Sequence, residues 1–151
     1  MKARYRANAV VNDALIRVRY AETDQMGVVY HSNYFIWFEI GRVELLRQHG
    51  FSYREMELDG YNLPVVEVRC RYKVPAQYDD TLVIRTRLVN LRPSLITFGY
   101  ETIRQSDGAL LAEGESIHIV VGPDKKKKIQ LPEKYITPLR RAIGSKAPAT
   151  L

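Results

Sequence analysis

Two ionisable residues stand just ahead of the most apolar stretch of the chain. Asp24 precedes His31 by seven positions, and Asn33 then opens a run rich in aromatic and aliphatic side chains. An aspartate is ionised at neutral pH and can serve as a general base or a nucleophile, while a histidine can orient or transfer a proton. If the apolar run is a helix, its first N–H groups favour an oxyanion or a polarised carbonyl. These residue types in this order suit the chemistry of acyl groups.

The same two residues also have structural explanations. An aspartate ahead of a helix is commonly a cap or a turn former, and a single histidine is commonly structural. Spacing alone leaves both explanations open. The elements that would position these residues therefore matter for the interpretation.

The apolar run predicts a long helix from Asn33 to near His49, because Gly50 is a ready C-terminal cap. Apolar side chains cover most of its circumference, so other elements should enclose it. Strand patterns predict that enclosure at Leu15–Tyr20, Pro64–Tyr72, Thr81–Leu91, Leu95–Arg104 and Leu110–Val121. We therefore expect an α+β fold in which a sheet wraps around one helix.

The chain length of 151 residues suits a single domain. We expect that domain to span residues 15–144, with an N-terminal extension at 1–14 and a flexible tail at 145–151. Within it, Ser52–Leu58 should add one or two short turns, and Pro132–Ile143 a final helix that ends at Gly144.

The composition is that of a soluble globular protein, with 46% apolar and 26% charged residues. No uninterrupted apolar run approaches about 18 residues, and the start of the chain lacks the apolar segment of a secretory signal. We therefore expect a cytoplasmic protein without stable membrane insertion. The single cysteine, Cys70, excludes an internal disulfide, and with His49 and His118 scattered along the chain no metal site is expected.

The charge balance points to anionic partners. The 23 basic and 17 acidic residues give a formal charge of +6, which would attract nucleic acid, acidic lipid headgroups or the phosphates of coenzyme A. The densest run, Lys125–Lys128, follows a turn and has two explanations, a solvated guard of a strand edge or a phosphate contact. Nucleic-acid binding is disfavoured, because no aromatic platform alternates with the basic residues.

The segment from Tyr20 to Arg42 resembles the signature of the 4-hydroxybenzoyl-CoA thioesterase family of hotdog-fold enzymes. The pattern D-x-x-G-x-V-x-x-x-N-Y-x-x-W is met by Asp24, Gly27, Val29, Asn33, Tyr34 and Trp37. With Tyr20 and His31 the segment is most similar to the bacterial acyl-CoA thioesterases associated with the Tol–Pal cell-envelope system. The resemblance implies an antiparallel sheet of about five strands around one long central helix. It also implies hydrolysis of a short-chain or aromatic acyl-CoA to free acid and coenzyme A, with no cofactor beyond the substrate itself.

The resemblance assigns catalytic roles to four residues. Asp24 would be the general base for water or the nucleophile that forms an anhydride, and both routes remain open. The backbone N–H of His31, together with that of Tyr30, would polarise the thioester carbonyl. The side chains of His31 and Tyr20 would orient groups or deliver a proton to the leaving thiolate. Tyr20 could equally be a packed strand residue.

The resemblance also places the rest of the substrate. Coenzyme A would contact four residues that flank the cleft, namely Arg92, Ser94, Lys127 and Lys128. The acyl pocket would be lined by Phe35, Phe38, Val65 and Val66, for which core packing is the competing explanation.

A single hotdog domain has an exposed sheet edge and half of a cleft. We therefore predict a homodimer that joins two sheets and stacks into a homotetramer, with each site between subunits. The alternative function is a non-catalytic hotdog module that binds acyl-CoA or acyl carrier protein.

Overall fold

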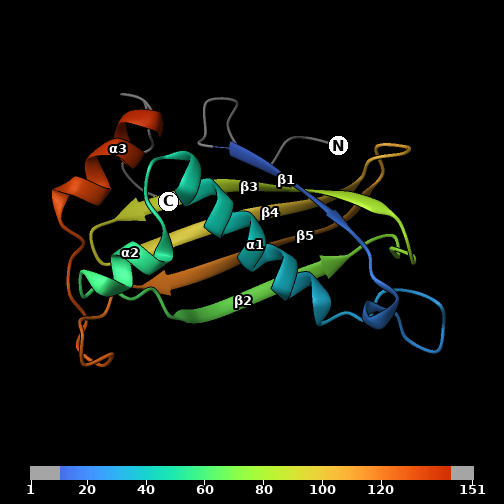
Figure 1. The fold of residues 1–151 in the computed structure, drawn as a ribbon, viewed down its shortest axis with the longest axis horizontal. Coiled ribbons are helices and arrows are strands. Elements are labelled where there is room, and N and C mark those ends of the chain that lie inside the picture. The colour runs from blue at the N-terminus through green and yellow to red at the C-terminus, as the bar shows by residue number, and fades with distance from the viewer. Residues whose placement is uncertain (1–10, 144–151) are drawn as a thin grey trace.

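A five-stranded antiparallel sheet carries the long helix α1 on one face in the computed structural model, which describes residues 11–143 (Figure 1). The strand order is β1-β3-β4-β5-β2. The strands are β1 Val11–Arg17, β2 Val65–Tyr72, β3 Thr81–Arg92, β4 Leu95–Arg104 and β5 Leu110–Ile119. The helices are α1 Asn33–Gln48, α2 Tyr53–Leu58 and α3 Glu133–Ile143, and a 3-10 turn, η1, spans Tyr20–Glu22. The predicted α+β arrangement is confirmed.

Helix α1 begins at the predicted residue and buries one face against the sheet. Trp37, Phe38 and Leu45 lie in the core, and the ring of Phe38 stacks on Tyr100 of β4 with centroids 4.3 Å apart. The opposite side is open, and Ile36 is 50% exposed. The predicted sheet therefore covers one face of the helix, and the described residues leave the opposite face exposed.

The strand β2 forms one edge of the sheet, and among residues 11–143 it pairs with β5 alone. Its side chains are mostly exposed, including Val65, Val66 and Val68. Exposed valines beside an unpaired strand edge are an unusual combination for a chain that stays alone, because such an edge invites pairing with another strand.

The first strand differs most from its prediction. It begins at Val11 and ends at Arg17, so residues 11–14 of the predicted extension belong to the sheet. Tyr20, predicted to end that strand, lies in the turn η1 instead. The predicted tail, 145–151, and Gly144 lie outside the described residues. The domain limits themselves stay predictions.

The side chains of β3 alternate between the two faces of the sheet, with charged residues on the face away from α1. Leu82 and Ile84 are buried, whereas Arg85 and Arg87 point to the other face. There Arg85 donates two hydrogen bonds of 2.9 Å to the carboxylate of Asp13 in β1. The sheet therefore has an apolar face for α1 and a charged face opposite.

Helix and sheet approach most closely at Gly41. A Cβ there would overlap the Oγ1 of Thr86 and lie 3.0 Å from the Cγ2 of Ile84. Thr86 is fully buried, so its hydroxyl has little room to move away from an added Cβ. Only a glycine fits α1 against β3 at this position.

We predict that Gly41→Ala lowers the free energy of unfolding by about 1–3 kcal/mol, because the overlap outweighs the better helix propensity of alanine. Urea unfolding followed by circular dichroism measures the change. Gly122→Ala is the matched control, because a Cβ there has its nearest neighbour at 3.5 Å. Equal stability of Gly41→Ala and wild type would show that α1 does not pack this closely.

Candidate active site

Asp24 lies in a tight loop that its own atoms hold together. Its N–H donates to the Val28 carbonyl at 2.9 Å, and its carboxylate oxygen Oδ1 accepts the Met26 N–H at 2.9 Å. Gly27 takes a φ of +80°, which is relaxed only for glycine. Within residues 11–143 the second oxygen, Oδ2, accepts no hydrogen bond. Asp24 is thus both the turn former considered above and a carboxylate with an oxygen available for chemistry.

The N-terminus of α1 leaves a backbone donor beside this loop. Tyr30 donates its N–H to the Glu22 carbonyl at 2.9 Å, so that group is already engaged. The His31 N–H has no acceptor among the described residues, and the carbonyl of His31 accepts the hydroxyl of Tyr72 at 2.9 Å. Of the two predicted donors, His31 is the one free to meet a substrate carbonyl.

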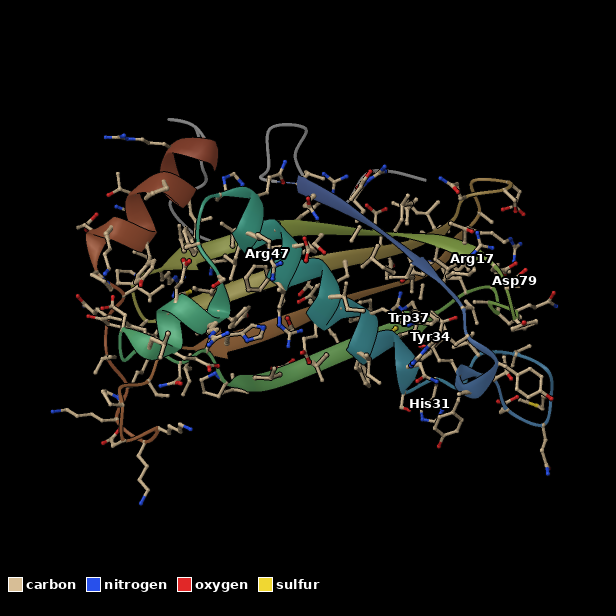
Figure 2. All side chains as sticks on the ribbon, viewed as in Figure 1. Arg17, His31, Tyr34, Trp37, Arg47 and Asp79 are labelled. Carbon is tan, nitrogen blue, oxygen red and sulfur yellow. The ribbon has the colours of Figure 1, made fainter. Side chains whose placement is uncertain are left out.

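Aromatic side chains surround this helix end. His31 lies at the start of α1, ahead of Tyr34 and Trp37 (Figure 2). Its ring centroid is 4.3 Å from that of Tyr30. Tyr20 is 78% exposed, with its ring edge against Tyr78 at 5.6 Å, so its hydroxyl is open to solvent.

Glu22 is a residue that the sequence reasoning missed. It is only 4% exposed, and its carboxylate accepts the Trp37 Nε1–H at 2.9 Å and the Arg19 N–H at 2.7 Å. Glu22 caps the turn η1 by accepting the Arg19 N–H, but an arginine at the first position is not the Ser or Thr of a capping box, so the sequence offered no such signal. Nothing in the sequence indicated that Trp37 would be its partner.

The predicted contacts for coenzyme A gather at one end of the sheet. Arg92 ends β3, and Ser94 follows in the turn, where its carbonyl accepts the Val120 N–H at 3.1 Å. Lys127 lies in the loop after β5, and its carbonyl accepts the Gly122 N–H at 3.0 Å, with Lys128 next to it. These four residues therefore share one end of the sheet.

Asp24 and His31 lie at the opposite end. The loop of Asp24 is tied to the segment that leads into β3 by a hydrogen bond from the Val29 N–H to the Ala76 carbonyl. Next to the start of β3, the Val18 N–H donates to the Asp80 carbonyl. Strand β3 has 12 residues, which span about 40 Å. Figure 1 shows the end of β3 and the start of α1 on opposite sides of the molecule. One chain therefore does not bring the two groups of predicted residues together.

The predicted acyl-pocket residues do not line one pocket either. Phe38 is fully buried in the core, as its competing explanation held, while Val65 and Val66 are exposed on β2. Pockets of about 210 Å³, around Cys70 and Gly114, and about 580 Å³, between the end of α1 and α3, are lined by neither Asp24 nor His31.

Comparison with known proteins identifies the family. The model of the thioesterase-like superfamily matches residues 18–139. The chain belongs to the thioesterase-like superfamily. The Bacillus subtilis protein YneP is 41% identical over 120 residues, which are 80% of this chain and 86% of YneP. The acyl-CoA thioester hydrolase YbgC of Escherichia coli O157:H7 is 32% identical over 126 residues, 83% of this chain and 93% of its own.

Solved structures of the superfamily share the architecture. The DHNA-CoA thioesterase of Staphylococcus aureus has a TM-score of 0.80 at 32% identity, and the match covers 87% of each chain. The sheet and α1 therefore form the hotdog fold predicted from the sequence.

Two further findings describe this superfamily member within residues 11–143. No helix there has the length and apolar character needed to cross a membrane. In the same residues, no three His, Cys, Asp or Glu side chains are grouped so that they could hold a metal ion.

Cys70 of β2 has a protonated thiol at neutral pH. Burial raises the pKa of this thiol to about 11, although the hydrogen bond with Tyr72 acts in the opposite direction. Because the thiolate is the reactive form, this cysteine is suited to packing and not to nucleophilic attack.

His118 of β5 takes part in a buried chain of hydrogen bonds. Its Nδ1 lies 3.1 Å from the Leu63 carbonyl, which can only accept, so Nδ1 carries the proton. Its Nε2 then accepts from Ser116 at 2.8 Å, and Ser116 accepts from Tyr100 at 2.6 Å. The neutral ring satisfies every partner. Burial therefore lowers the pKa of His118 to about 4, and the charge of Arg42 adds to this effect.

We predict from the lowered pKa of His118 that the free energy of unfolding falls on acidification. Between about pH 6.5 and pH 4 the unfolded chain binds a proton at His118 that the folded chain refuses, so stability falls as the pH is lowered. We expect a contribution of roughly 3 kcal/mol over this window. Urea unfolding of wild type and His118→Asn at several pH values isolates it. Parallel pH profiles for the two proteins would contradict the prediction.

Proposed function

We propose that this member of the thioesterase-like superfamily hydrolyses acyl-CoA thioesters to a carboxylic acid and coenzyme A. The observation that carries the proposal is the presence of two available groups near the start of α1: within residues 11–143, Asp24 Oδ2 accepts no hydrogen bond and the His31 N–H has no acceptor. The relative YbgC, named an acyl-CoA thioester hydrolase, supports the reaction class.

The proposed reaction uses these two groups on one carbonyl. The His31 N–H stabilises the negative charge that develops on the thioester oxygen. Asp24 either takes a proton from the attacking water or attacks the carbonyl carbon itself to form an anhydride, which water then opens. The C–S bond breaks, and the thiolate of coenzyme A takes up the proton. The side chains of His31 and Tyr20 are the candidate groups that deliver it.

The proposed substrate is a short-chain or aromatic acyl-CoA. The likeness to the Staphylococcus aureus enzyme, which is named for DHNA-CoA, supports an aromatic acyl group. Closer kinship with the 4-hydroxybenzoyl-CoA thioesterases and the Tol–Pal-associated enzymes is part of the proposal. It rests on the motif from Tyr20 to Trp37 and on the similarity to YbgC. We also propose a cytoplasmic enzyme that needs no cofactor, with acyl carrier protein as the alternative carrier of the acyl group.

We further propose that two chains complete each site by pairing their β2 edges, and that such dimers stack into tetramers. Antiparallel pairing about a two-fold axis would place the Asp24 end of one sheet beside the basic end of the other. The exposed β2 edge and the separation of the two groups of predicted residues in one chain support this arrangement.

Asp24→Asn should reduce kcat by at least about 100-fold on the best substrate of an acyl-CoA panel, while the affinity for acyl-CoA stays close to wild type. The change keeps the size of the side chain and removes its basicity. A thiol-release assay measures turnover, and calorimetry measures binding. Asp79→Asn makes the same charge change at the same end of the molecule (Figure 2), on a side chain that pairs with Arg17 at 3.4 Å.

The two halves of this test separate the candidate functions. Asp79→Asn should retain wild-type turnover, since asparagine tolerates the positive φ of this position. If wild type binds acyl-CoA but releases no thiol from any ester, the chain is a binding module and not a hydrolase.

Mixing two defective chains should restore turnover if the site spans two subunits. One chain carries Asp24→Asn, and the other carries alanine at Arg92, Lys127 and Lys128. A mixed dimer then holds one intact site, so random exchange of subunits should regain about a quarter of wild-type turnover at limiting substrate. Failure of exchanged mixtures to exceed either parent would show that each chain builds its own site.

A further inference from the structure

Glu22 is a buried acid that the proposed chemistry does not use. Its side chain is almost completely removed from water, and burying a carboxylate is costly unless it is hydrogen-bonded. Here each oxygen has its own N–H donor, from Arg19 at 2.7 Å and from the indole of Trp37 at 2.9 Å. The guanidinium of Arg19 lies 3.5 Å from the carboxylate. Packing alone does not explain why a charged carboxylate occupies this buried position.

The contacts of Glu22 join the loop of Asp24 to α1 from two sides. Its side chain binds Trp37, which lies one turn into the helix. Its backbone carbonyl accepts the Tyr30 N–H and the Asn33 side-chain amide, both at 2.9 Å. Tyr30 and Asn33 flank His31 in the sequence, and Asp24 follows Glu22 by two residues. These hydrogen bonds therefore tie the segment just before Asp24 to the residues before and after His31.

We propose that Glu22 is a positioning residue, whose buried carboxylate sets Asp24 against the helix end that carries the His31 N–H. The inference rests on the proposed function, because it concerns the geometry of that same site. A misplacement of about 1 Å between a catalytic group and its substrate can cost about 100-fold in rate. Glu22 holds this geometry without touching the substrate.

A glutamine at this position cannot replace the acid. Both oxygens of Glu22 face N–H donors, whereas a glutamine has one acceptor oxygen and one donor nitrogen. Glu22→Gln therefore sets its amide N–H₂ against the N–H of either Arg19 or Trp37. Trp37→Phe removes one of these donors, so the double variant no longer contains the clash.

Kinetics of four proteins test the proposal: wild type, Glu22→Gln, Trp37→Phe and the double variant. We expect Glu22→Gln to lower kcat by about 10- to 100-fold with KM within about threefold of wild type. The double variant should lose less than the product of the two single losses. Tyr135→Phe is the matched control, because it removes a 3.0 Å hydrogen bond to Asp59 at the far end of the chain. Its kcat should stay within about twofold of wild type.

Amide hydrogen exchange supplies a readout that does not need turnover. Weaker contact between the Glu22 segment and the start of α1 should speed exchange at the Tyr30 N–H by about tenfold in Glu22→Gln. Exchange rates in the core strands should stay unchanged. If wild type shows no thioesterase activity but Tyr30 exchange rises in Glu22→Gln, the link from Glu22 to the start of α1 is supported and the proposed function is refuted.

The proposal is overturned if wild type is active and Glu22→Gln keeps its kcat within about twofold. It is also overturned if the kcat loss of the double variant equals the product of the two single-variant losses and the Tyr30 N–H of Glu22→Gln exchanges at the wild-type rate. Should Glu22→Gln fail to fold, Trp37→Phe alone decides, since it removes one donor and leaves the acid in place. A folded Trp37→Phe with wild-type kcat and wild-type Tyr30 exchange would then refute the positioning role.

Discussion

The close contact of α1 with the sheet determines where every group of the candidate site lies. Gly41 lets the helix backbone approach Thr86, and Phe38 stacks on Tyr100, so the helix has little freedom to slide along the strands. A shift by one helical turn would move its N-terminus by about 5.4 Å. That distance would separate the His31 N–H from the loop of Asp24. The geometry of the candidate site therefore depends on this contact between α1 and the sheet.

The elements with strong local signals could be predicted from the sequence. Helix α1 begins at Asn33 and gives way to Gly50, whose φ of +92° is the expected glycine conformation. Strands β3 and β4 begin where their patterns begin. The first strand was misplaced, because Val18 is buried like a strand residue although the chain has already left the sheet. The open side of α1 could not be foreseen, because an apolar helix surface does not reveal whether its own chain or another one covers it.

The residues of the candidate site also differ in whether a local sequence pattern could reveal them. Asp24 and His31 follow each other closely in the sequence, so a local pattern was enough to find them. Glu22 was missed, since its burial depends on Trp37, fifteen residues further along the chain. The separation of Arg92 and Lys127 from Asp24 also arises from the whole length of β3, which no local pattern contains.

In the proposed dimer, this separation would give the exposed edge of β2 a function. At about 40 Å, several Debye lengths at physiological salt, the basic end of one chain has almost no electrostatic effect on its own Asp24. Attraction of the coenzyme A phosphates would therefore bring the substrate to the wrong end of an isolated chain. In the proposed dimer, the two-fold axis places the basic end of each chain beside the Asp24 of its partner. An edge with Val65, Val66 and Val68 exposed would be a liability in a monomer, whereas in the proposed dimer it would be the surface through which such a site is completed. Assembly would then be a requirement of catalysis itself, in addition to any gain in stability.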